Sequence, residues 1–169
     1  MTTTERSEPS TTAGEREMLD GWLDYHRETL EAKCAGLSDE QLRKRSVEPS
    51  ELSLLGLVRH LAECERGWFR NVLAGEDLPT IYSEEDRDGD FHATEQDTYA
   101  EAYATWQAEI ARARKLAATC SLDDIGTGEH RSGDTFNLRW ILTHMIEEYA
   151  RHNGHADLLR ERIDGATGD

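Results

Sequence analysis

Apolar residues recur every three or four positions over four long stretches of the chain, and this spacing predicts four amphipathic helices. The stretches cover about residues 15–35, 52–73, 95–118 and 137–162. No segment alternates convincingly between apolar and polar residues, and no internal repeat is present. The pattern therefore predicts an all-α fold, a four-helix bundle whose helices bury their apolar faces against one another.

Glycines and capping residues indicate where these helices end and begin. Gly36 is expected to end the first helix, and Ser38 with Gln41 resembles a capping box that starts a short helical turn. Two stretches, 76–94 and 121–135, are rich in acidic residues or glycine and predict long inter-helix loops. Because long loops in a small domain are often functional, we expect them to cover one end of the bundle.

The polar ends of the chain set the expected domain limits. Residues 1–12 are rich in Thr, Ser and Glu and are predicted to be disordered. Residues 13–165 are predicted to form one domain, and residues 166–169 to fray.

Charge and composition exclude several classes of partner. Acidic residues outnumber basic ones by 35 to 19, which gives a net charge of −16. This balance argues against nucleic acid and anionic membranes, since phosphates are bound by clustered Lys and Arg. No apolar run approaches the roughly 20 residues that span a bilayer, and no signal region is evident, so a cytoplasmic protein is expected. The three cysteines, Cys34, Cys64 and Cys120, are widely spaced, which favours reduced thiols over disulfides or a zinc site.

Candidate chemistry is concentrated in the last predicted helix, which carries His144, Glu148, His152 and His155. At about 100° per residue these side chains fall within roughly 80° of one another on the helix surface. Imidazole nitrogens and carboxylate oxygens are ligands of zinc, and bundle cores commonly hold such sites on facing helices. His60, inside the second apolar helix, is the expected ligand from elsewhere. The predicted metal ligands are therefore His60, Glu148 and His152.

Other polar residues near the predicted ligands are expected to support the metal site or to have ordinary structural roles. Histidines at the edge of an apolar helix face often serve only as hydrogen-bonded groups. For each of these histidines considered alone, that structural role remains an alternative to metal binding. His155 is the candidate catalytic residue, as a group that orients a ligand or moves a proton. His144 lies furthest from the apolar stripe and is expected to be exposed. Glu63 and Glu65, which follow His60, are expected on a solvated face.

Two segments together resemble a known superfamily. The segment LGLVRHLAECERGWF around His60 and the segment HMIEEYARHNGHADLLRE around His152 resemble the DinB-like metal-binding four-helix bundles. The likeness extends from about residue 15 to 165 and is greatest for the branch related to mycothiol-dependent maleylpyruvate isomerase and the mycothiol S-transferases. In that branch the first ligand of the last helix is a glutamate. The resemblance therefore implies His60, Glu148 and His152, the trio that the spacing also indicates.

The resemblance implies a metal and a reaction as well as a fold. The family site usually holds zinc and sometimes nickel, and members are often dimers, so a homodimer is one expectation. The isomerase has a further C-terminal domain, whereas this chain ends after the metal helix, which is more consistent with a stand-alone transferase. We expect the metal to activate a small thiol, mycothiol, for attack on an electrophile. Two alternatives stay open: a metal-stabilised bundle that binds a partner or stress ligand without turnover, and a metal-dependent hydrolase.

Overall fold

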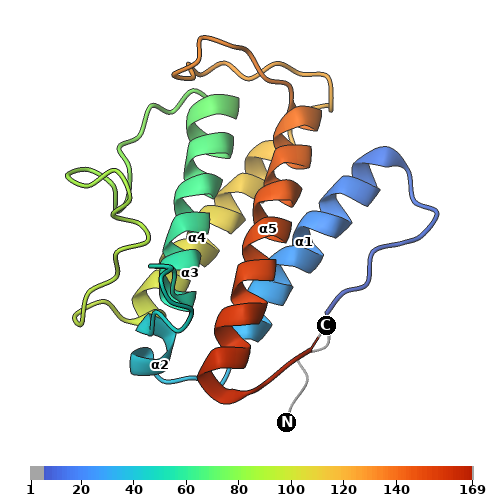
Figure 1. Cartoon of the computed structure of the whole chain (residues 1–169). Coiled ribbons are helices and arrows are strands. Elements are labelled where there is room, and N and C mark those ends of the chain that lie inside the picture. The colour runs from blue at the N-terminus through green and yellow to red at the C-terminus, as the bar shows by residue number, and fades with distance from the viewer. Residues whose placement is uncertain (1–5, 169) are drawn as a thin grey trace.

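Four long helices lie side by side in the computed structural model, which describes residues 6–168 (Figure 1). In chain order the elements are α1 (Glu15–Cys34), α2 (Asp39–Arg43), α3 (Leu54–Glu65), the π-helix η1 (Arg66–Leu73), α4 (Tyr99–Ala117) and α5 (Leu138–Asp164). Helix α1 packs along α5, and α3 packs along α4. No strand occurs among the described residues. The predicted all-α bundle is therefore confirmed.

Short polar side chains fix where the helices begin. The side chains of Ser53, Thr98 and Asn137 accept hydrogen bonds from backbone N–H groups in the first turns of α3, α4 and α5. The expected capping box is present: Ser38 accepts from the backbone of Gln41, whose side chain in turn accepts from the backbone N–H of Ser38. These caps start α3 and α4 a few residues later than the apolar pattern predicts.

The second predicted helix, 52–73, is not one regular α-helix. It changes to a π-helix after Glu65, and the backbone N–H of Ala74 bonds to the carbonyl five residues back, at Phe69. π-Helical turns are rare and often lie at functional sites. Hydrophobic periodicity cannot distinguish the two helix types, because both bury one face over so few residues.

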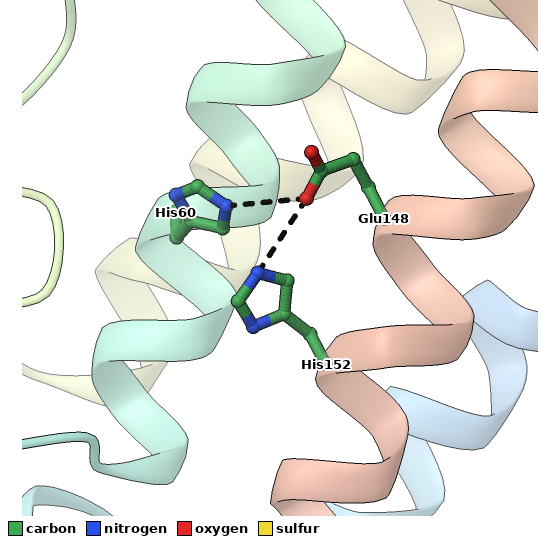
Figure 2. Close-up of side chains that lie close together, drawn as sticks. All are labelled: His60, Glu148 and His152. Carbon is green, nitrogen blue, oxygen red and sulfur yellow. Dashed lines mark ion pairs between the residues drawn. The ribbon is translucent and has the colours of Figure 1, made fainter. Parts of the chain in front are cut away.

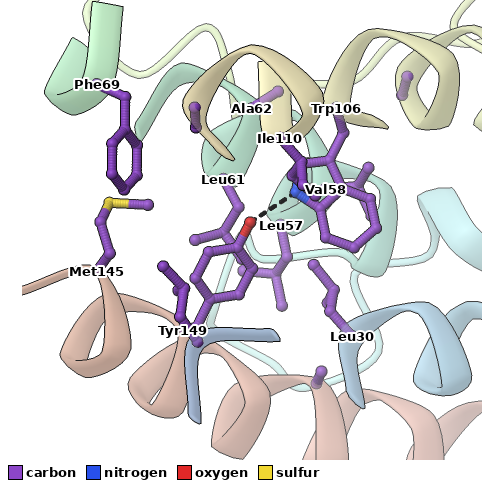
Figure 3. Packing of buried hydrophobic residues seen from close by; sticks show 14 of the residues in the cluster. Leu30, Leu57, Val58, Leu61, Ala62, Phe69, Trp106, Ile110, Met145 and Tyr149 are labelled. Atoms are coloured by element: carbon purple, nitrogen blue, oxygen red, sulfur yellow. Dashed lines mark hydrogen bonds between the residues drawn. The ribbon is translucent and has the colours of Figure 1, made fainter. Parts of the chain in front are cut away.

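A buried polar network joins all four long helices at the centre of the core. The indole N–H of Trp106 on α4 donates to the hydroxyl of Tyr149 on α5 (2.7 Å, Figure 3). That hydroxyl donates to the carboxylate of Glu65 (2.8 Å), which also accepts two hydrogen bonds from Arg27 on α1 (2.8 Å each). Glu65 is fully buried, so the expectation of a solvated side chain was wrong for this residue. A carboxylate can be buried here because it is fully paired.

The loop between η1 and α4 is tied to α3. The Arg59 guanidinium donates to the backbone carbonyls of Gly89 and Asp90 (2.9 and 3.1 Å). Gly56 permits the close approach, since a Cβ there would lie 2.7 Å from the carbonyl oxygen of Phe91. The side of α3 that carries His60 is thus covered by this loop.

The second long loop and the chain ends also contact the bundle. The backbone N–H groups of Thr127 and Gly128 donate to carbonyls at the end of η1. In the segment predicted to be disordered, the backbone N–H of Ser7 donates to Glu28 on α1 (2.6 Å). Residues 1–5 and 169, which belong to the two predicted tails, lie outside the described residues. Across residues 6–168, every helix is too short or too polar to cross a membrane.

Candidate metal centre

Helices α3 and α5 bring His60, Glu148 and His152 together between them (Figure 2). The Oε2 atom of Glu148 lies 3.8 Å from Nε2 of His60 and 3.5 Å from Nε2 of His152. The two imidazole rings have their centroids 4.6 Å apart and their planes at 59° to each other. All three side chains are largely buried, with exposed fractions of 18, 16 and 8 % respectively. The three residues predicted from spacing thus converge, although His60 lies 88 residues before Glu148 in the chain.

Asp90 fixes the orientation of the His60 ring. Its Oδ2 atom lies 2.7 Å from Nδ1 of His60, and its Oδ1 atom accepts a hydrogen bond from the backbone of Phe91 (3.0 Å). The Phe91 ring stacks on the imidazole at 4.3 Å between centroids. With Nδ1 bound to Asp90, Nε2 is the nitrogen turned toward Glu148. Carboxylates commonly hold metal-binding histidines in this way.

The arrangement of charges perturbs the pKa values of the cluster. Burial alone would lower the pKa of His60, but hydrogen bonds with Asp90, Cys64 and Glu148 outweigh it and raise the pKa to about 11. Hydrogen bonds with His152 and His60 hold the pKa of Glu148 far below its usual range. The metal-free cluster therefore holds a proton on His60 beside an ionised Glu148 at neutral pH.

His155 and Cys64 lie immediately outside the trio. Nδ1 of His155 is 3.3 Å from Nδ1 of His152, on the side of the ring away from Glu148. Burial and the neighbouring His152 and Arg151 lower the pKa of His155. The thiol of Cys64 lies 3.5 Å from Nε2 of His60, and burial raises its pKa. Cys34, Cys64 and Cys120 are all unpaired, as predicted.

His144 was expected to be exposed, but it is largely covered. Its side chain is 23 % exposed because aromatic rings enclose it, and its Nε2 atom lies 3.6 Å from Oε1 of Glu148. Trp140 stacks on the imidazole at 4.8 Å, and the edge of Trp68 meets it at 4.7 Å. Projection on a helical wheel could not foresee this cover, since the rings come partly from η1.

The donor set fits a divalent transition metal. Two imidazole nitrogens and one carboxylate oxygen are ligands that zinc accepts, leaving one position free in a four-coordinate site. Donor atoms on a tetrahedral zinc with bonds of about 2.0–2.1 Å lie roughly 3.3 Å apart. The separations of 3.5 and 3.8 Å are only slightly longer, and the three ligand atoms all lie within 4.8 Å of one another. The same ligands also suit nickel.

Sequence reasoning missed two features of this region. Asp90 lies 30 residues from His60 in an acidic loop, and nothing in the local pattern distinguishes it from its acidic neighbours. A separate cavity of about 170 Å³ was not foreseen either. It shares no residue with the trio and is lined mainly by α1, α4 and their neighbours, including Arg16, Asp20, Asp24, Arg27, Ala113 and Arg114.

The fold and this cluster define a helical bundle that carries an imidazole–carboxylate site between two of its helices. The chain matches the Mycothiol-S-transferase family over residues 18–165, and it belongs to that family. This result confirms the resemblance drawn from the two sequence segments. A conserved protein from Enterococcus faecalis has a similar solved structure, with a TM-score of 0.62 and 16 % sequence identity over 92 % of this chain and 100 % of that chain. This likeness supports the fold alone. No match to a curated protein was found.

Proposed function

We propose that His60, Glu148 and His152 bind one divalent metal ion, zinc in preference to nickel, and that the protein is a mycothiol-dependent S-transferase. The observation that carries the proposal is the convergence of two nitrogen donors and one oxygen donor from two helices, with one imidazole held by Asp90. Family membership supports a small-molecule thiol as one substrate. The second substrate is an electrophile whose carbon accepts the sulfur.

We propose a role for each side chain from its contacts around the cluster. Asp90 holds the His60 ring in one orientation, and Phe91 packs on that ring and limits the entry of water. Glu148 remains ionised because its pKa lies far below the physiological range. An ion bound there would supply the positive charge that favours the thiolate form of a bound thiol.

We assign to His155 the acceptance of the proton that the thiol loses. Its lowered pKa leaves the ring neutral near pH 7, and a neutral imidazole can accept a proton. The ring lies one helical turn beyond His152 and is partly exposed, so it can pass the proton to solvent. The sulfur then forms its new bond to the electrophile.

The proposal is tested by comparing zinc-loaded protein with chelator-stripped protein. Each sample is incubated with mycothiol and a chromogenic electrophile, and thioether formation is followed. We expect conjugation that depends on zinc and is lost in Glu148→Ala and His152→Ala. Glu161→Ala, an exposed glutamate on the same helix, is the matched control and should behave as wild type.

The other outcomes point to the alternative functions. Release of acid from an ester without any thiol would indicate a hydrolase in place of a transferase. Tight zinc binding without any turnover would indicate a binding protein. Conjugation at equal rates with and without zinc would contradict the proposed role of the cluster.

A further inference from the structure

The cavity of about 170 Å³ lies between α1, α4, α5 and η1, and none of the predicted metal ligands lines it. Part of its lining is apolar and shielded from water. The apolar lining residues are buried, with exposed fractions of 5 % or less; they are Leu23, Phe69, Ala113, Ala117 and Leu142. The inner part of the cavity is therefore suited to an apolar group.

Charged residues form the open side of the cavity. Asp20 and Asp24 on α1 are partly exposed, and Arg114 on α4 is exposed. The cavity thus runs from an apolar interior to a polar mouth. Small-molecule sites have this layout, in which apolar walls hold the body of the ligand and a few polar groups fix its orientation.

The volume of the cavity suits one small ring. In proteins, an apolar cavity of about 150 Å³ stays dry and binds benzene. The cavity here is slightly larger, at about 170 Å³, so it has room for a six-membered ring with a short substituent. The side chains of Leu23, Phe69 and Leu142 would contact such a ring through dispersion forces.

Two of the arginines that line the cavity have no donor nitrogen to spare. The three nitrogens of Arg16 donate to Asp20 and to two backbone carbonyls at and after the end of α4 (2.7, 2.9 and 2.9 Å). The three nitrogens of Arg27 donate to Asp24 and to the buried Glu65 (2.8 Å each). An anionic ligand would therefore have to displace an existing ion pair to bind either guanidinium group.

Two carboxylate oxygens at the cavity have no hydrogen-bond partner within residues 6–168. Arg27 and Arg114 both donate to Oδ1 of Asp24, and Oδ2 stays unbonded. Arg16 donates to Oδ2 of Asp20, and Oδ1 stays unbonded. Each of the three guanidinium groups has a carboxylate partner, so the charges around the cavity are balanced. The lining therefore favours a ligand that donates a hydrogen bond and carries no charge.

We propose that this cavity binds a small neutral aromatic alcohol. The ring lies against the buried apolar residues, and the hydroxyl group donates to Oδ2 of Asp24 at the mouth. Asp24 is the preferred acceptor because it is less exposed than Asp20 (36 against 46 %), which shields its hydrogen bond better from water. The site is separate from the candidate metal centre, so the proposal does not depend on the transferase function.

The ligand class is tested with four probes that share one ring: benzyl alcohol, toluene, benzoate and benzylamine. Binding to the whole protein is followed by NMR titration of the methyl signals of Leu23, Ala113 and Leu142. We expect benzyl alcohol to shift these signals and to bind about tenfold more tightly than toluene, which lacks the hydroxyl group. Benzoate and benzylamine, which are charged at neutral pH, should also bind about tenfold more weakly than benzyl alcohol.

Two variants that fill the cavity test its location. Ala113→Leu and Ala117→Leu each place a larger apolar side chain in the lining, and each should weaken benzyl alcohol binding about tenfold or more. Ala111→Leu is the matched control, because Ala111 lies on the exposed face of the same helix and should leave binding at the wild-type value. Circular dichroism checks that the three variants are folded.

Two further variants test the hydroxyl contact without filling the cavity. In Asp24→Ala the affinities for benzyl alcohol and toluene should become about equal, because the acceptor is lost. In Asp20→Ala the roughly tenfold preference for benzyl alcohol should remain. The ratio of the two affinities isolates this contact, since a general disturbance of the cavity weakens both probes.

Four results would overturn the proposal. The first is the absence of any shift of these methyl signals at millimolar benzyl alcohol. The second is binding of toluene, benzoate or benzylamine as tight as that of benzyl alcohol. The third is wild-type affinity for benzyl alcohol in both folded cavity-filling variants, or an equal loss in Ala111→Leu. The fourth is an unchanged preference for benzyl alcohol in Asp24→Ala.

Discussion

Replacing Asp90 with asparagine should weaken zinc binding by about 10- to 100-fold, because Asp90 sets the orientation and proton position of the His60 ring. Both oxygens of the buried carboxylate are in use: one pairs with Nδ1 of His60 at 2.7 Å, and the other accepts from the backbone of Phe91 at 3.0 Å. An asparagine side chain has only one acceptor for these two donors. If its NH₂ group faces the ring, Nδ1 must be the acceptor and the ring proton moves to Nε2, where a metal ion would bind.

The expected loss corresponds to about 1.4–2.7 kcal/mol of binding free energy. It is measured by competition for zinc with a chromogenic chelator at fixed pH. Asp86→Asn is the control, because Asp86 pairs with His92 in the same loop, but Asp86 is exposed and neither residue belongs to the cluster. Zinc affinity in Asp90→Asn within threefold of wild type, or an equal loss in Asp86→Asn, would show that Asp90 does not prepare His60 for the metal.

Three further perturbations test other parts of the structure. Zinc binding near pH 7.5 should release about one proton per ion, because His60 has a pKa of about 11 in the metal-free cluster and must lose its proton to bind. Calorimetry in buffers of different ionisation enthalpy measures the number of protons released, and a value of zero would contradict this prediction. In the metal-free protein, the stability that protonated His60 provides should be fully present below its ordinary pKa of 6.5 and be lost as the pH rises through about 11. The free energies of unfolding of wild type and His60→Gln, measured in urea, should therefore differ most near pH 6.5 and least near pH 11. A difference that grows with pH would contradict this prediction. Tyr149→Phe should lower the free energy of unfolding by about 1–3 kcal/mol, because it leaves the buried Trp106 N–H without an acceptor. The zinc stoichiometry should stay at the wild-type value. A loss of stability below about 0.5 kcal/mol would show that the buried network adjusts freely.

The helices and the trio could be predicted from the sequence because both depend on regular spacing. Apolar periodicity located the long helices, and the interval of four residues placed Glu148 and His152 on one face. Pairing them with His60 also needed a second helix to lie opposite, which the resemblance to known bundles supplied. Helix starts were less well placed, since Ser53 and Thr98 act through single hydrogen bonds that the apolar pattern does not register.

The features that sequence reasoning missed all depend on contacts between distant segments. Asp90 approaches His60 only because Arg59 and Gly56 hold the loop against α3. Glu65 looked like a surface residue, yet Arg27 and Tyr149 make its burial favourable from two other helices. In each case the residue type is ordinary, and only its tertiary partners give it a role.

The buried network and the candidate metal centre are neighbours along both helices that carry the site. Tyr149 follows Glu148 directly, and Glu65 lies next to Cys64 on α3. The hydrogen bond between Tyr149 and Glu65 therefore fixes the register of α5 against α3, directly beside Glu148 and five residues from His60. Precise placement of ligands on two separate helices requires such a link, since a shift of one residue would turn Glu148 away from His60.

X-ray absorption spectroscopy of the protein loaded with one zinc ion per chain identifies the atoms bound to the metal. We expect a shell of nitrogen and oxygen donors only, at about 2.0–2.1 Å, with the scattering signature of two imidazoles. In His60→Ala the signature of the second imidazole should be lost. A sulfur shell at about 2.3 Å would instead place Cys64 on the ion. Retention of one tightly bound zinc ion per chain in Glu148→Ala would show that this carboxylate is not a ligand, and either result would contradict the proposed trio.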